Sequence, residues 1–183
     1  TIDRIWNSTS QLTPMAPLLR DAVKRFLRTS SRTALLFRND MLADFAANAL
    51  RHDEECGTVI DSRIEKRMLL FLDNNRFEDL LQLPETERNY IKTLVCVAPT
   101  RAQILALLSR PWLPDNLVVL ADSDTLANAG RDATRLASFP ELNAIHSRLM
   151  EFGKKAAQTV HHAGLGEGVE EARDEDVEFP TSG

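Results

Sequence analysis

The chain is poor in the residues that build phosphate-cradling loops and disulfide frameworks. It has seven glycines in 183 residues, and it contains no GxGxxG, GxxxxGK[ST] or GxSxG motif. Its two cysteines are too few for a disulfide framework, and both lie beside apolar segments. We therefore expect Cys56 and Cys96 to be buried, reduced thiols of an intracellular protein.

Long apolar runs are also missing. No stretch of about 18 apolar residues is present, so we expect no membrane insertion. The start, Thr1-Ile2-Asp3-Arg4-Ile5-Trp6, has neither the basic beginning nor the apolar stretch of a secretory signal. Because the chain begins at Thr1 and not at Met, it leaves open whether a leader or an N-terminal segment is missing. We expect a soluble protein of the cytoplasm or of an organelle matrix.

The chain has no strong basic excess, and negative charge is concentrated at one end. Residues 165–183 contain seven acids and one base, a net charge of −6, whereas the whole chain carries −5. Residues 1–164 are therefore close to neutral, which argues against bulk electrostatic binding to nucleic acid. We expect one helix-rich domain over 1–164 and an acidic tail over 165–183 that is disordered or ordered by a partner. Five of its acids are the predicted partner-binding residues of the tail: Glu170, Glu171, Asp174, Glu175 and Asp176.

Apolar residues recur every three or four positions along most of the chain, which predicts a succession of amphipathic helices. Start signals precede most of them. We expect four helices to begin near Thr13-Pro14, at an Asp40 cap, at Asn75-x-x-Glu78 and at Thr100-x-x-Gln103. Three longer helices are expected: one from Thr58-x-x-Asp61 through Ile60–Leu72, one from Pro84 through Ala98, and one from Ser138-x-x-Glu141 to Gly164.

Three short apolar runs do not show a helical period. They are Ala34–Phe37, Thr93–Val97 and Asn116–Ala121, and the last two are rich in valine. Periodicity alone cannot assign runs of this length. The fold class we expect is mainly α, a multi-helix bundle or an irregular helical array. The alternative is a mixed α/β chain with a small βαβ unit around 93–121.

One local motif has the chemistry of a metal site. Asp122 and Asp124 follow the apolar run Leu117–Ala121 and precede Thr125-Leu126. Two carboxylates at the end of a strand can hold a divalent cation. The stretch resembles the DxD strand of glycogenin-like GT-A glycosyltransferases, which implies a metal-dependent enzyme acting on a nucleotide sugar. It also resembles the strand of aspartyl-nucleophile phosphatases, without the glycine after the second Asp. The other interpretation is that Asp122, Ser123 or Asp124 caps the following helix.

Three further patterns contain residues that can bind a metal or act as a nucleophile. His52 and Cys56 are four residues apart, so on a helix they share a face and can chelate zinc, but no second pair with ligand spacing follows. His161 and His162 are adjacent and would point in different directions on a helix. Cys96 is a nucleophile only if a base and an orienting group accompany it. We expect neither a cofactor nor a metal to be bound at these residues.

A basic helix is the remaining feature. Lys24, Arg25 and Arg28 form a local positive patch that Arg32 and Arg38 extend. This patch can bind an acidic protein or RNA. A nucleic-acid-associated factor that binds through residues 20–38 is therefore an alternative function. The sequence favours a non-catalytic role: a protein–protein interaction domain acting as a subunit, adaptor or regulatory factor, whose acidic tail contacts another protein with a basic surface.

Overall fold

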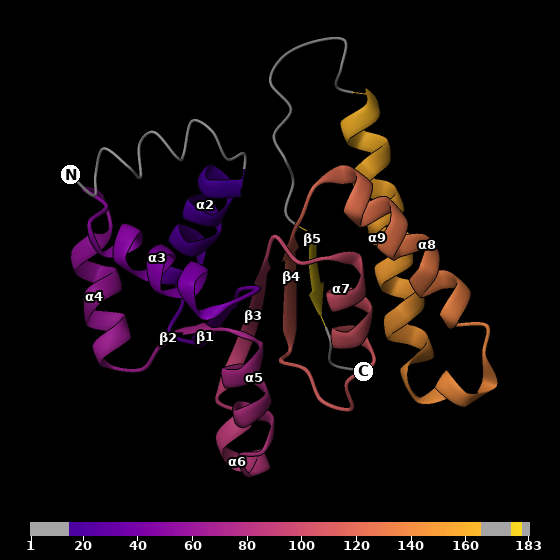
Figure 1. Cartoon of the computed structure of the whole chain (residues 1–183), viewed down its shortest axis with the longest axis horizontal. Helices are drawn as coiled ribbons and strands as arrows, with labels where there is room; N and C mark the ends of the chain where they lie inside the picture. The colour runs from indigo at the N-terminus through magenta and orange to yellow at the C-terminus, as the bar shows by residue number, and fades with distance from the viewer. Residues whose placement is uncertain (1–14, 166–176, 181–183) are drawn as a thin grey trace. The chain divides into compact units, whose positions relative to one another are not determined.

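The computed structural model describes residues 15–165 and 177–180. The chain divides into two compact units, Thr1–Ala98 and Pro99–Gly183. Its described elements are mainly helices, with a smaller α/β component built on short strands (Figure 1). The described elements fit a mainly α chain with a small α/β unit, whereas the multi-helix bundle that was also expected is not confirmed. The prediction of a single domain over 1–164 stays a prediction.

The first unit is built on a three-stranded parallel sheet. Strand β1 (Arg32–Leu36) lies between β2 (Leu69–Leu72) and β3 (Ile91–Val97). In this register Ala34 is opposite both Leu70 and Leu94. Most side chains of β1 and β3 are buried, which is the pattern of parallel strands that are covered on both faces.

Helices connect and cover these strands. They are α2 (Met15–Leu27), α3 (Asp40–Arg51), α4 (Gly57–Glu65), α5 (Asn74–Leu81) and α6 (Glu85–Arg88). Each of the longer helices buries a stripe of apolar side chains, as the sequence spacing predicts. Fully buried members of this core include Val23, Leu35, Leu50, Ile60, Leu94 and Val95.

The second unit combines helices with two strands. Its elements are α7 (Arg101–Leu108), β4 (Asn116–Leu120), α8 (Ser123–Leu136), the 3₁₀ helix η1 (Pro140–Ile145), α9 (His146–Leu165) and β5 (Val177–Pro180). Strand β5 pairs antiparallel with β4, with Leu117 opposite Phe179. Four residues of the predicted tail therefore pair with a strand of the same chain.

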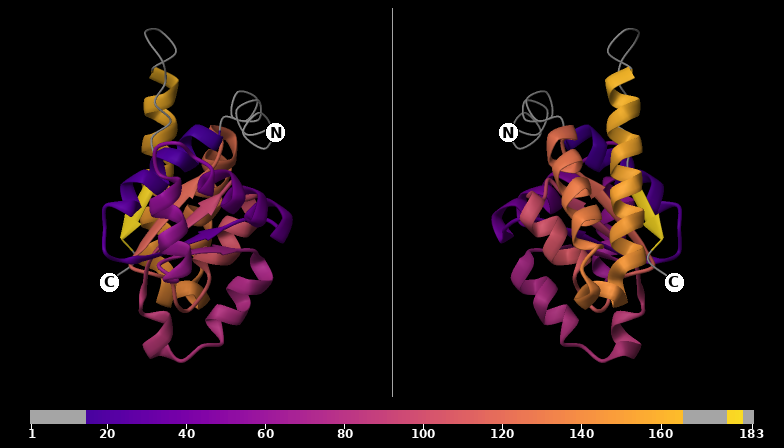
Figure 2. Two further views of the ribbon diagram at one scale, coloured as in Figure 1. Left: turned by 90° about the vertical axis from the view of Figure 1, so that its left-hand side faces the viewer. Right: turned by 90° about the vertical axis from the view of Figure 1, so that its right-hand side faces the viewer.

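Helices α8 and α9 lie side by side (Figures 1 and 2). Three of the four residues whose spacing predicts the docking face of the last helix, Leu149, Phe152 and Ala156, are buried. The fourth, Ile145, lies in η1 and is only half-buried. Two glycines allow the close approach. A Cβ on Gly153 would lie 2.1 Å from Thr134 Oγ1 and 3.0 Å from Gly130 O, and a Cβ on Gly130 would lie 2.8 Å from Ala156 Cβ.

Two predicted helices are wrong over part of their length. The helix expected through Ile60–Leu72 ends at Glu65, and Arg67 then turns the chain into β2 with a φ of 54°. The helix expected from Pro84 through Ala98 is α6 alone, and the rest is β3. The three ambiguous apolar runs are the strands β1, β3 and β4. Short buried strands offer no polar alternation, so their spacing also fits a helical stripe.

Helix starts were predicted with mixed success. The capping box of Thr100 and Gln103 is confirmed. The cap of α3 is Asn39, not Asp40, and the cap of α5 is Asp73, not Asn75. Helix α4 begins after Cys56 without a side-chain cap, so the Thr58 capping box is wrong. Thr13-Pro14 lies outside the described residues. The predicted start at Ser138-x-x-Glu141 is wrong, because Phe139 precedes the 3₁₀ helix η1 without a side-chain cap and α9 begins only at His146.

Among the described residues, no helix is both long enough and apolar enough to cross a membrane. The acids from Glu170 to Asp176 lie outside the described residues.

Candidate functional site

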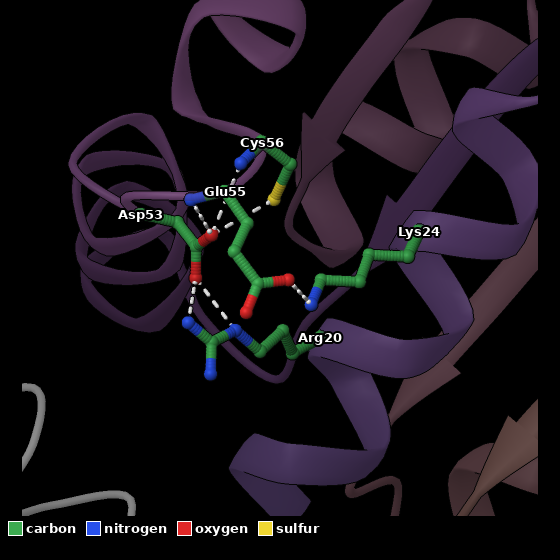
Figure 3. Close-up of polar contacts among 5 residues, drawn as sticks. All are labelled: Arg20, Lys24, Asp53, Glu55 and Cys56. Atoms are coloured by element: carbon green, nitrogen blue, oxygen red, sulfur yellow. Dashed lines mark hydrogen bonds and ion pairs between the residues drawn. The ribbon is translucent and has the colours of Figure 1, made fainter.

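The basic face of α2 meets an acidic turn of the same unit. Residues 52–56 connect α3 to α4, and two of their carboxylates face α2 (Figure 3). Arg20 Nε donates to Asp53 Oδ2 at 2.6 Å, and Lys24 Nζ donates to Glu55 Oε2. Lys24, a cation of the predicted basic patch, and Arg20, one turn before it on α2, are therefore neutralised by acids 31 and 33 residues further along the chain.

Asp53 is the centre of this cluster. Its side chain is 0 % exposed, and its Oδ1 accepts three further hydrogen bonds: from Glu55 N–H (3.0 Å), Cys56 N–H (3.1 Å) and Cys56 Sγ (3.2 Å). Burial alone raises the pKa of Asp53, but the hydrogen bonds from Cys56, Glu55 and Arg20 outweigh it, so the pKa lies below its ordinary value. Asp53 is therefore a buried, ionised carboxylate with a full set of donors.

The same cluster makes Cys56 a weak nucleophile. Burial raises the pKa of its thiol to about 11, and the hydrogen bond to Asp53 adds to this effect. His52 and Cys56 do not share a helix face as the zinc interpretation requires, because His52 is the C-cap of α3 and Cys56 immediately precedes α4. His52 Nδ1 lies 2.7 Å from the carbonyl oxygen of Asn48. Over residues 15–165 and 177–180, no three His, Cys, Asp or Glu side chains gather as a metal site.

Two ion pairs, Arg20–Asp53 and Lys24–Glu55, therefore hold α2 against the turn between α3 and α4. The chemistry of this arrangement is that of a structural ion-pair cluster, since the thiol is held protonated and the carboxylate is fully hydrogen-bonded. Lys24 is a partner-binding residue predicted from the sequence, whereas Arg20 and Asp53 were not predicted as site residues. The acidic run at 53–55 was the available signal, but sequence alone does not show which base it faces.

The remaining basic residues are not gathered at this cluster. Arg25 and Arg28 are exposed, and Arg38 lies beyond β1. Arg38 Nε donates to the carbonyl oxygen of Ala98 at 2.7 Å, which joins the carboxyl ends of β1 and β3. Ala98 has a φ of 47°, in the region that favours glycine. This contact was not predicted from the sequence.

Asp122 has the geometry of a helix cap. Its Oδ1 accepts from Thr125 N–H and its Oδ2 from Thr125 Oγ1, both at 2.7 Å. The hydrogen bond from Thr125 N–H, followed by that from the hydroxyl, lowers the pKa of Asp122. The capping interpretation is confirmed for Asp122, whereas Asp124 lies in the first turn of α8 with its side chain exposed. Metal binding by Asp122 and Asp124 stays an untested alternative to the expectation that no metal is bound.

The last predicted candidates are a cysteine and two histidines. Cys96 is 2 % exposed within β3, and burial raises the pKa of its thiol to about 12. It is therefore a protonated thiol of the core, as expected. His161 is exposed near the end of α9, and the side chain of His162 lies outside the described residues.

Comparison of the chain with models of protein families, with curated proteins and with solved structures finds no match. The chemistry of its sites is therefore judged from this chain's own residues.

Proposed function

We propose that the chain acts through protein–protein contacts, as a subunit, adaptor or regulatory factor of a larger assembly. The observation that carries this proposal is an apolar surface on α3. Met41 is 70 % exposed, Leu42 41 % and Phe45 36 %, and the three residues fall within one turn of the helix. Large apolar side chains grouped on a surface are typical of partner contacts.

The acidic segment is the second contact in this proposal. Residues 166–176 contain six acids and one base, and they join α9 to β5. We propose that this segment contacts a basic surface of the partner. The compensation of Arg20 and Lys24 by Asp53 and Glu55 supports an external partner, because the body retains less positive charge to attract its own tail.

The pairing of β5 with β4 determines how the acidic segment should be tested. Deleting 165–183 would remove a strand together with the charge. The six acids of 166–176 should therefore be changed to their amides, with the strand left intact. A matched control changes the exposed Glu85 and Glu87 of α6 to glutamine.

Binding of a fluorescent ten-arginine peptide should be measured for these proteins at low and moderate salt. We expect the amide variant to bind at least about fivefold more weakly at low salt, with the difference reduced by screening. The control should bind within about twofold of the original chain. Equal binding by the amide variant would refute a role for the segment in recognising basic surfaces.

The contact at the α3 surface should be tested by hydroxyl-radical footprinting of the assembled complex. The complex should be isolated at native expression level and oxidised with hydroxyl radicals, with Met41 compared with Met150, which is 42 % exposed in the second unit. We expect Met41 to be protected in the complex relative to the free chain, while Met150 keeps its rate. Unchanged oxidation of Met41 would show that α3 is not the contact surface.

A further inference from the structure

One face of α4 borders an open pocket of about 470 Å³ in the first unit. Thr58, Val59, Ser62, Arg63 and Lys66 come from α4 and its end, Ser30 comes from the turn after α2, and Met68 precedes β2. The volume is in the range of pockets that hold small molecules.

The lining combines two cations and three hydroxyl groups with a small apolar wall. The cations are Arg63 and Lys66, and the wall consists of Val59 and Met68. No acid is among these lining residues. The nearest acids in sequence are Asp61 and Glu65, and Asp61 is paired with Arg51 Nε at 3.1 Å.

Arg63 is held in place beside the pocket. Its Nη2 donates to the carbonyl oxygens of Leu27, at 2.8 Å, and of Thr29. These bonds fix both the guanidinium and the turn that carries Ser30. Within the described part of the chain, by contrast, the Lys66 amine and the Ser30, Thr58 and Ser62 hydroxyls have no hydrogen bond or ion pair. The pocket therefore offers several donors that the rest of the described fold does not use.

We propose that this pocket binds a phosphate monoester that carries a small apolar substituent. Hydroxyl groups, an ammonium and a guanidinium all donate hydrogen bonds, and charge-assisted bonds to phosphate oxygens are the strongest they make. Val59 and Met68 would contact the substituent. This site lies in the first unit and does not rest on the acidic segment, so its failure would leave the proposed function unchanged.

The test is a titration of the ¹⁵N-labelled full chain followed by NMR. The probes are phenyl phosphate, inorganic phosphate and phenol at constant ionic strength. We expect amide shifts confined to Ser30 and to residues 58–68, with phenyl phosphate binding at least about threefold more tightly than inorganic phosphate and about tenfold more tightly than phenol. Phenol binding as tightly as phenyl phosphate would overturn the proposal, as would shifts spread over basic residues throughout the chain.

Variants then assign the donors. Lys66→Gln should weaken phenyl phosphate binding about fivefold to tenfold, and Lys66→Arg should retain most of it. Lys154→Gln is the matched control, because Lys154 is an exposed lysine of α9 in the second unit. Its affinity should stay within about twofold of the original. Absence of pocket shifts at about 10 mM phenyl phosphate, or equal losses for Lys66→Gln and Lys154→Gln, would rule the site out.

Discussion

Asp53 accepts a hydrogen bond from the guanidinium of Arg20, and its own side chain is fully buried. The charge of this buried carboxylate is therefore compensated by a side chain that is itself partly exposed. Asp53→Asn keeps the shape and removes the charge. We expect it to lower the free energy of unfolding by about 2–3 kcal/mol at pH 7, since Arg20 and the Cys56 thiol lose their acceptor charge. Urea unfolding measures this, with Glu54→Gln, an exposed neighbour, expected to cost under about 0.5 kcal/mol.

The same pair predicts a pH dependence. The pKa of Asp53 is lower in the folded state than its ordinary value of 3.8, so its contribution is fully present above 3.8 and is lost as pH falls through the folded pKa. We therefore expect the difference between the original chain and Asp53→Asn to be constant from pH 7 to pH 5 and to shrink below about pH 3.8. A difference that grows on acidification would contradict this assignment.

Both thiols should be unreactive in the folded chain. With pKa values of about 11 for Cys56 and about 12 for Cys96, only about one Cys56 thiol in a thousand is ionised at pH 8. Iodoacetamide labelling followed by mass spectrometry should be at least about a hundredfold slower in buffer than in urea, where both residues become ordinary thiols. Fast labelling of Cys56 in the folded chain would show that it is an activated cysteine.

Asp122 and Asp124 should differ in their effect on stability. Asp122→Ala removes the cap of α8 and should cost about 0.5–2 kcal/mol, whereas Asp124→Ala should cost less than about 0.5 kcal/mol. The glycosyltransferase-like alternative predicts instead that millimolar Mn²⁺ or Mg²⁺ raises the melting temperature and that Asp124→Asn abolishes the rise. Thermal unfolding of the original chain and of the three variants, with and without metal, distinguishes the two interpretations.

Gly153→Ala should destabilise the second unit although alanine is the better helix former. The gain in helix propensity is about 1 kcal/mol, but the new Cβ would lie 2.1 Å from Thr134 Oγ1 and 3.0 Å from Gly130 O. We expect a net loss of about 1–3 kcal/mol by thermal or urea unfolding. Adding Thr134→Ala should recover part of it. A stabilised Gly153→Ala protein would show that the helices separate freely.

Ala98→Gly should be neutral or stabilising, by up to about 1 kcal/mol. The left-handed conformation of Ala98 carries a cost of about 1–2 kcal/mol that glycine avoids, and the greater freedom of glycine in the unfolded chain offsets part of the gain. Ala106→Gly, at an exposed position of α7, should instead cost about 1 kcal/mol. Both are measured by urea unfolding.

Local chemistry was predicted best. The capping box of Thr100 and Gln103 and the cap at Asp122 involve residues three apart, so the sequence contains both partners of each interaction. The buried face of α9 follows in the same way from the spacing of Leu149, Phe152 and Ala156.

Features that require residues far apart in the sequence to meet, such as strand pairing, long-range ion pairs and the pocket, were not predicted. Phe71 and Leu72 fit a helical stripe with Ile64, and only their pairing with β1 makes them a strand. Likewise, Arg20 and Asp53 are 33 residues apart, and no local pattern indicates that they meet. The pocket beside α4 was missed for the same reason, because Ser30 and Met68 join it from separate segments.

The glycine contact between α8 and α9 has a consequence for motion. If α9 slid or rotated by one position, a side chain as large as Phe152 or Lys154 would replace Gly153 against α8, where even a Cβ would lie 2.1 Å from Thr134 Oγ1. The two helices therefore have a single register, and small sliding steps are sterically blocked. A binding event that pushes α9 along its axis would therefore have to move α8 with it or separate the two helices.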